Sequence, residues 1–130
     1  MVAIDTNVLV RLLTADDPGQ YQRSLAVFRD EPVIHIPETV ALEAEWVLRA
    51  AYALDPVMIC RTFRWLFGLP NVVLAHPQRM ARAIAWHESG LDFSDALHLS
   101  CSQHCSTMKS FDRTLIARSA DFGECRVVSP

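Results

Sequence analysis

The sequence lacks the features that mark membrane-spanning, secreted or strongly basic chains. It has no apolar stretch of roughly 18 residues, so we expect no segment that crosses a membrane. No basic leader precedes the first apolar run at Met1, and we therefore expect a cytoplasmic protein. The formal net charge is −3, without a run of like charges. This argues against binding nucleic acid through overall positive charge, although a local basic rim stays compatible with it.

The chain does have enough apolar sequence for one hydrophobic core. Its 130 residues fall in the commonest size range for a domain, and 51% of them are apolar. We therefore expect a single ordered domain over residues 1–130. A chain of this size and composition does not need disulfide bonds, so we expect reduced thiols at core-like positions. The four cysteines are Cys60, Cys101, Cys105 and Cys125.

Short apolar runs alternate with helical patterns along the whole sequence. The strand candidates are Val2–Asp5, Val33–Ile36, Val72–Ala75, Arg126–Val128 and, with a weaker pattern, Ser106–Ser110. The predicted helices are Thr6–Leu13, Pro18–Asp30, Pro37–Leu54, Pro56–Phe67, Pro77–Ser89, Asp92–Cys105 and Asp112–Ala120. Strands that alternate with helices predict an α/β sandwich whose parallel sheet is covered on both faces.

Two aspartates stand where a predicted strand ends and a helix begins. Asp5 closes the first apolar run and precedes a helical pattern, and Asp112 repeats this arrangement later in the chain. Asp112 alone would be interpreted as a helix N-cap. In a parallel sheet, however, the strand ends emerge at one edge, where α/β proteins hold their ligands. We therefore expect both carboxylates at that edge.

Further acidic residues lie on two predicted helices. Glu43 lies about 75° from the centre of the expected core face and has no basic neighbour on its own helix. Glu45 instead has Arg49 four residues on, which predicts an ordinary surface ion pair. Asp92 and Asp95 share one face of a first helical turn, where Asp92 fits a capping role. That core face comprises Val40, Ala44, Val47, Leu48 and Ala51.

The chemistry of these acids favours one kind of metal. Four carboxylates at Asp5, Glu43, Asp95 and Asp112 would form a hard, oxygen-rich site, which suits Mg²⁺ or Mn²⁺ better than zinc. A softer set, His98, Cys101 and Cys105 with His104 nearby, shares one predicted helix. Zinc sites normally draw ligands from more than one element, so we interpret this set as core packing. His98, one turn after Asp95, is also a candidate for a hydrogen bond near the acidic site.

Four segments carry a resemblance to a known family. They are Val2-Ala3-Ile4-Asp5-Thr6-Asn7-Val8-Leu9, Leu42-Glu43-Ala44-Glu45-Trp46-Val47-Leu48, Asp92-Phe93-Ser94-Asp95-Ala96-Leu97 and Ser110-Phe111-Asp112-Arg113. These segments look like the PIN-domain family and, more closely, the VapC-type toxins of bacterial type II toxin–antitoxin pairs. The resemblance implies a three-layer α/β sandwich with a central, mainly parallel five-stranded sheet.

The same resemblance implies a function and a set of site residues. It implies a Mg²⁺-dependent endoribonuclease, with Mn²⁺ as a substitute, that cleaves RNA through a metal-activated water and is blocked by a cognate antitoxin. The catalytic, metal-binding acids would be Asp5, Glu43, Asp95 and Asp112. Auxiliary roles would fall to Asp92, Thr6, Asn7 and Ser110, the last of which keeps the hydroxyl of the threonine usual at its position.

Other functions and partners follow from the residues. A binding module without turnover is the alternative, although the presence of all four acids argues against it. A haloacid-dehalogenase-like phosphatase needs a second aspartate where Asn7 stands, and a response-regulator receiver needs an early pair of acids that is missing. Aromatic residues crowd two consecutive helices and predict a homodimer or antitoxin interface: Trp46, Tyr52, Phe63, Trp65 and Phe67. Candidate phosphate contacts are Arg11, Lys109, Arg113 and Arg118.

Overall fold

Short parallel strands alternate with longer helices along the chain, as the sequence predicts. The computed structural model describes residues 1–130 and contains seven α-helices, five strands and one short 3₁₀ helix, η1. The chain divides into two units, Met1–Pro77 and Gln78–Pro130, which we call unit 1 and unit 2. The α/β class is confirmed by this alternation.

Three parallel strands form the sheet of unit 1. They are β1 (Val2–Ala3), β2 (Ile34–His35) and β3 (Val72–Val73), in the order β1-β2-β3. Val2 pairs with Ile34, which in turn pairs with Val72. Ile34 is fully buried because a strand in the middle of a covered parallel sheet has neither face in water.

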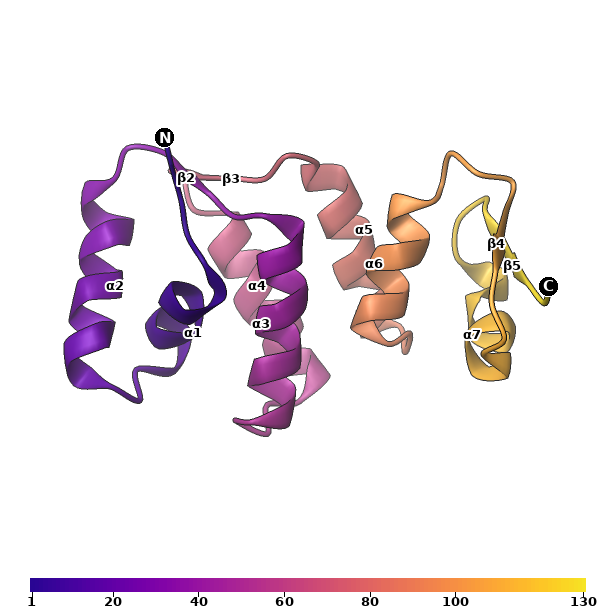
Figure 1. Cartoon of the computed structure of the whole chain (residues 1–130), viewed down its shortest axis with the longest axis horizontal. Helices are drawn as coiled ribbons and strands as arrows, with labels where there is room; N and C mark the ends of the chain where they lie inside the picture. The colour runs from indigo at the N-terminus through magenta and orange to yellow at the C-terminus, as the bar shows by residue number, and fades with distance from the viewer. The chain divides into compact units, whose positions relative to one another are not determined.

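Four helices follow the strands of unit 1 and pack beside them (Figure 1). They are α1 (Thr6–Thr14), α2 (Pro18–Asp30), α3 (Glu38–Ala50) and α4 (Pro56–Phe67). Aspartates cap three of them by accepting a hydrogen bond from a backbone N–H of the first turn. Helix α1 packs against α2 and α3, and α4 packs against α3 and β3.

Unit 2 combines three helices with a parallel pair of strands. It contains α5 (Pro77–Glu88), α6 (Phe93–Cys101), β4 (Thr107–Lys109), α7 (Arg113–Arg118), η1 (Ser119–Asp121) and β5 (Arg126–Val128). Thr107 pairs with Arg126, so the weak strand candidate at Ser106–Ser110 is confirmed as β4. Helix α7 packs against β5 and η1 (Figure 1).

The structure corrects three sequence predictions about the elements. The helix predicted over Pro37–Leu54 ends at Ala50. The five strands form sheets of three and two strands, not one continuous five-stranded sheet. The helix predicted to reach Cys105 ends at Cys101. Polar side chains explain this early end, because the Ser102 hydroxyl donates to the His98 carbonyl and the Gln103 amide donates to the Leu99 carbonyl. Such bonds satisfy the last carbonyls of a helix without another helical turn.

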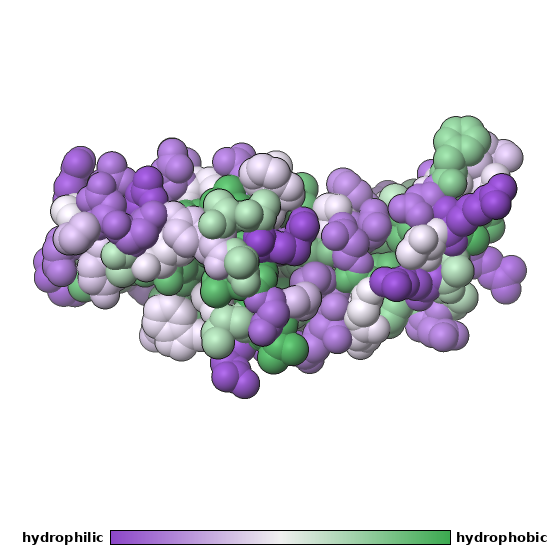
Figure 2. All heavy atoms as spheres, turned by 90° about the horizontal axis from the view of Figure 1, so that it is seen from below, coloured by the Kyte–Doolittle hydropathy of each residue, from purple (hydrophilic) through white to green (hydrophobic).

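Large apolar side chains reach the surface of unit 1 on α3 and α4. Trp46 is 59% exposed and Trp65 is 56% exposed, whereas Phe63 is fully buried against the core. Val57 and Met58 are also exposed on α4. Figure 2 shows hydrophobic residues among hydrophilic ones on the face seen from below. The predicted aromatic cluster is therefore divided between the core and the surface.

Two further observations complete the fold. No helix is long and apolar enough to cross a membrane. All four cysteines are free thiols, and Cys60 and Cys125 are buried. Cys105 and His98 are exposed, so the predicted core packing of the His98, Cys101 and Cys105 set is wrong for those two residues. The early end of α6 explains the exposure of Cys105, which lies beyond the helix.

Candidate functional site

Asp5 lies between β1 and α1 in unit 1 and is the N-cap of α1. Its carboxylate accepts a hydrogen bond of 3.1 Å from the Val8 backbone N–H, and its side chain is exposed. Thr6 is buried and Asn7 is exposed in the first turn of the same helix. The predicted place of Asp5 between a strand and a helix is therefore confirmed. The capping bond uses one carboxylate oxygen, Oδ1, so lone pairs remain for a further ligand.

The environments of Glu43 and Glu45 on α3 are the reverse of those that the sequence predicts. Glu43 is exposed, whereas Glu45 is 2% exposed. The buried face of α3 consists of Ala41, Ala44, Glu45 and Leu48, so it is rotated from the predicted core face. Arg49 donates to the Glu45 carboxylate at 3.2 Å, which confirms the ion pair but corrects its surface location. Glu43 is thus the solvent-facing acid of this helix.

Asp92 and Asp95 lie at the start of α6 in unit 2. Asp92 occupies the N-cap position, but its carboxylate makes no capping bond to the helix backbone. It accepts a hydrogen bond of 2.6 Å from the Ser94 hydroxyl instead. The predicted N-cap position of Asp92 is therefore confirmed, but the predicted capping hydrogen bond is wrong. Asp95 lies in the first turn of α6 and is partly buried.

Asp112 is held at the end of β4 by two sets of contacts. Its carboxylate caps α7 by accepting from the backbone N–H groups of Thr114 at 2.9 Å and Leu115 at 3.2 Å. Its own backbone N–H donates to the Ser110 hydroxyl at 3.0 Å. The N-cap interpretation of Asp112 is confirmed, and the Ser110 hydroxyl accepts the bond from its backbone N–H.

In unit 2, the charges of Asp92 and Asp112 act on Asp95. Burial raises the pKa of Asp95, and the negative charges of Asp92 and then Asp112 raise it further. His98 acts in the opposite direction and lowers the pKa of Asp95. The hydrogen bond suggested for His98 stays a prediction. A bound cation would relieve this repulsion. We call Asp92, Asp95 and Asp112 the negative centre of unit 2.

The acids have the right chemistry to bind a divalent ion, but their side chains are not arranged as a metal site. Carboxylate oxygens are the ligands that Mg²⁺ and Mn²⁺ prefer. No group of three or more His, Cys, Asp or Glu side chains is arranged so that it could hold a metal ion. Because Asp5 and Asp112 each direct an oxygen at helix N–H groups, part of each carboxylate is already used.

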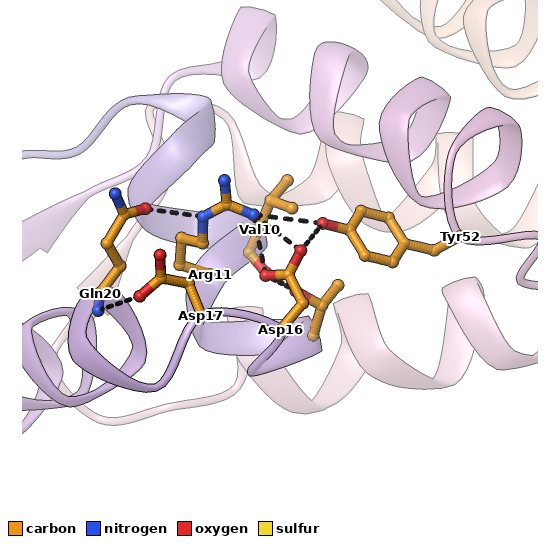
Figure 3. Close-up of polar contacts among 7 residues, drawn as sticks. Val10, Arg11, Asp16, Asp17, Gln20 and Tyr52 are labelled. Atoms are coloured by element: carbon orange, nitrogen blue, oxygen red, sulfur yellow. Dashed lines mark hydrogen bonds and ion pairs between the residues drawn. The ribbon is translucent and has the colours of Figure 1, made fainter.

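Arg11 and Arg118, two of the predicted phosphate contacts, are engaged within the protein. Arg11 donates to Asp16 at 2.8 Å, to Gln20 at 2.7 Å and to the Tyr52 hydroxyl at 3.2 Å (Figure 3). Tyr52 in turn donates its hydroxyl hydrogen to Asp16. Arg118 donates to the Gly90 carbonyl at 3.1 Å. The interpretation of Arg11 and Arg118 as free cations for phosphate is therefore not supported.

An open groove beside α1 contains a basic residue that the sequence reasoning missed. The groove has a volume of about 290 Å³, and Asn7, Arg11 and Arg23 lie along it with Val8 and Val27. Arg23 is exposed on α2, six residues after the Asp17 N-cap. The only sequence signal for Arg23 was its place on a polar helix face, which many surface arginines share.

His87 on α5 is a second residue that sequence patterns did not single out. His87 is 7% exposed, and its Nδ1 lies 2.7 Å from the Leu91 carbonyl oxygen. The other ring nitrogen, Nε2, is buried without a hydrogen-bond partner. The ring also meets Phe93 edge-on, with centroids 5.6 Å apart. A histidine near the end of an amphipathic helix gives no sequence signal of such burial.

Comparison with known proteins identifies the family. The profile of the PIN domain matches residues 2–119, which spans both units and nearly the whole chain. The PIN domain is generally a nuclease fold, and PIN nucleases commonly use divalent metals. No curated protein sequence matches the chain. The match confirms the resemblance to PIN domains that the acidic segments indicated, and the chain belongs to the PIN domain family.

Proposed function

We propose that the protein is a metal-dependent endoribonuclease that acts as the toxin of a type II toxin–antitoxin module. The observation that carries the proposal is the negative centre of unit 2, where Asp92 and Asp112 help to raise the pKa of a partly buried Asp95. Membership of the PIN family supports the nuclease assignment. The substrate class is single-stranded or structured RNA, cleaved at a phosphodiester bond.

The proposed metal ligands are the carboxylates of Asp5, Glu43, Asp95 and Asp112. Mg²⁺ is the proposed ion, with Mn²⁺ as its substitute, because both prefer oxygen ligands. When bound, such an ion lowers the pKa of water and stabilises the charge on the attacking and leaving oxygens. Asp92, Thr6, Asn7 and Ser110 are assigned auxiliary roles.

The chain's own residues prepare the acids for this task. Capping bonds hold the Asp5 and Asp112 carboxylates in fixed orientations, so little side-chain freedom is lost on binding a ligand. Ser110 holds the backbone of Asp112, and Ser94 holds the carboxylate of Asp92. The raised pKa of Asp95 means that this carboxyl takes up a proton more readily than an ordinary aspartate.

Basic residues along the α1–α2 groove are proposed to contact the RNA backbone. Arg23 is exposed there and is the best-placed cation, because Arg11 is neutralised by Asp16. Lys109 and Arg113 are exposed near Asp112 and remain proposed phosphate contacts. A few local cations suit a protein of net charge −3, which has no general affinity for polyanions.

The proposed partners are a cognate antitoxin and a second copy of the chain, in the cytoplasm. The exposed apolar side chains of Trp46 and Trp65 support an interface on α3 and α4, because aromatic residues are enriched at the centres of interfaces. Sedimentation equilibrium of the wild type and the Trp46→Arg/Trp65→Arg double variant tests the dimer. An unchanged mass for the double variant would exclude this surface.

A binding module without turnover is the second candidate function. The specific observation in its favour is that Asp5 and Asp112 already serve as helix caps, while no three acidic, histidine or cysteine side chains form a metal-binding group. Such a module would hold RNA or a protein and leave it intact. Affinity for RNA without cleavage, insensitive to Asp95→Asn, would favour this candidate.

The decisive experiment is RNA cleavage by purified protein from which any bound partner has been removed. Single-stranded and structured RNAs are incubated with Mg²⁺, Mn²⁺ or EDTA, and products are separated on denaturing gels. We expect cleavage with either ion and none with EDTA. Asp95→Asn should reduce the rate by more than about 100-fold, because even partners of metal ligands contribute 10- to 100-fold.

Matched controls separate the site from general charge effects. Glu124→Gln removes an exposed acid of unit 2 that lies outside the proposed metal ligands, and it should leave the rate unchanged. Asp5→Ala and Glu43→Gln test the acids of unit 1 in the same assay. Equal cleavage by wild type and Asp95→Asn across the RNA panel would overturn the nuclease proposal. Growth arrest on expression, relieved by co-expression of the adjacent gene, tests the toxin role separately.

A further inference from the structure

The turn between α5 and α6 leads directly into the acidic start of α6. Gly90 has a φ of +111°, which L-residues with side chains rarely adopt. Its N–H donates to the His87 carbonyl at 3.0 Å, and the Leu91 N–H donates to the Trp86 carbonyl at 3.1 Å. These bonds form a Schellman-type helix end. Only four residues separate α5 from α6, so any shift of the turn is passed on to Asp92 and Asp95.

His87 holds one carbonyl of this turn with its side chain. Because a carbonyl oxygen only accepts hydrogen bonds, the Nδ1 atom that faces Leu91 at 2.7 Å must carry the hydrogen. Nε2 is then a buried acceptor without a partner, an arrangement that costs about 1–3 kcal/mol. A leucine would fill the site without this penalty. The Nδ1–H bond to Leu91 therefore accounts for the presence of an imidazole.

Arg118 holds the preceding carbonyl from a different helix. Its guanidinium donates to the Gly90 carbonyl at 3.1 Å. Arg118 is the last residue of α7, and Asp112 is the N-cap of the same helix. Six helical residues span about 9 Å at the usual rise per residue, so the two ends of α7 are rigidly related. Arg118 thereby connects the helix of Asp112 to the turn that precedes Asp95.

We propose that His87 and Arg118 are positioning residues that clamp the consecutive carbonyls of Gly90 and Leu91 and so fix Asp95 relative to Asp112. We call these four residues the turn clamp. Neither side chain of the clamp is proposed to touch substrate or metal. The catalytic consequence of the clamp rests on the proposed nuclease function. Its structural part, the tie between α7 and the turn, is independent of that function.

Paired variants test each half of the clamp. His87→Asn keeps a nitrogen donor where Nδ1 stands, whereas His87→Leu removes the donor and fills the space. Arg118→Lys keeps a cationic donor, and Arg118→Met does not. Arg126→Met, which alters an exposed arginine of β5 in the same unit, is the matched control.

Kinetics and stability together distinguish positioning from a merely structural role. We expect His87→Leu and Arg118→Met to lower kcat by about 10- to 100-fold with little change in KM, as found for residues that orient metal ligands. His87→Asn and Arg118→Lys, which keep the donors, should retain a kcat near the wild-type value. His87→Leu should melt close to the wild type, since it removes an orphaned polar atom but also takes the donor from the Leu91 carbonyl. Wild-type kcat in His87→Leu, or equal losses in His87→Asn and His87→Leu, would overturn the proposal.

NMR of the protein without RNA tests the turn clamp separately from the nuclease function. Long-range ¹⁵N–¹H spectra should show His87 protonated at Nδ1 and not at Nε2, and the opposite tautomer would overturn the clamp. In Arg118→Met the backbone amide signals of Asp95 and Asp112 should both shift, while Arg126→Met leaves them in place. If these shifts appear in a protein that never cleaves RNA, the clamp stands and the nuclease function fails. If the wild type cleaves but neither amide moves, the clamp fails alone.

Discussion

Asp112 lies close enough to Asp95 for the two carboxylates to repel each other, although β4 separates them in the chain. Burial contributes most to the raised pKa of Asp95, followed by the charge of Asp92 and then that of Asp112. Folding therefore brings negative charges together against their mutual repulsion. Natural proteins accept such a loss of stability mainly where a site must act.

Replacing Asp95 should stabilise the fold in a pH-dependent way. A carboxyl whose pKa is raised on folding favours the folded state below its unfolded value of about 3.9, and this advantage is lost as the pH rises through the folded pKa. Asp95→Asn should therefore be more stable than wild type at pH 7, with the difference vanishing near pH 3. Urea unfolding at both pH values measures this. A variant that is less stable at pH 7 would contradict the prediction.

Divalent cations should raise the melting temperature of the wild type. The crowded acids near Asp95 are relieved by a bound cation, and binding at about 100 times Kd adds about 2.7 kcal/mol to the free energy of unfolding. Thermal melts with Mn²⁺ or Mg²⁺, compared with EDTA, provide the measurement. Asp95→Asn should lose most of the shift, and Glu124→Gln should keep it. A wild-type melting temperature indifferent to both ions would contradict the charge argument.

The sequence predicts the order of the elements well because local patterns determine it. Proline and aspartate at helix starts define α2 and α4, and short apolar runs define β1 and β2. The division into sheets of three and two strands depends on contacts distant in sequence, and no local pattern reports them.

The acids at strand ends were predictable, but the environments of the helical acids were not. Asp5 and Asp112 follow strands directly, so their places at helix starts are visible in the sequence. The face that α3 buries depends on what packs against it, and a rotation of the helix exchanges Glu43 with Glu45. The tie from Arg118 to Gly90 joins residues 28 apart and involves a backbone acceptor, which leaves no trace in side-chain patterns.

Breaking the Arg49–Glu45 pair should cost more than breaking a surface pair. Glu45 is 2% exposed, so Arg49→Met leaves a buried carboxylate without its cationic partner. We expect a loss of about 1–3 kcal/mol, against about 0.3–0.5 kcal/mol for an exposed helix pair. Arg29→Met, which breaks the exposed pair with Asp30, is the matched control. Equal small losses in the two variants, measured by urea unfolding, would restore the surface interpretation of Glu45.

The Tyr52 hydroxyl should contribute to stability at neutral pH and less in acid. Its hydrogen bond is the largest cause of the lowered pKa of Asp16, ahead of the bond from Arg11 (Figure 3). A carboxyl with a depressed folded pKa stabilises the fold above its unfolded pKa of about 3.9, and this stability is lost as the pH falls through the folded pKa. Tyr52→Phe should therefore destabilise the protein more at pH 7 than near pH 2.

Carboxyl NMR and a second tyrosine make the Tyr52 prediction specific. The pKa of Asp16 in Tyr52→Phe should move up toward the ordinary aspartate value, because the Tyr52 hydrogen bond is the largest cause of its lowering. The pKa should stay below that value, since Arg11 and Thr14 still donate to Asp16. Tyr21→Phe, on α2, should leave the pKa of Asp16 unchanged. If Tyr52→Phe unfolds with the same free energy as wild type at both pH values, the hydroxyl contributes nothing to the fold. The network would then be held by Arg11 and Thr14.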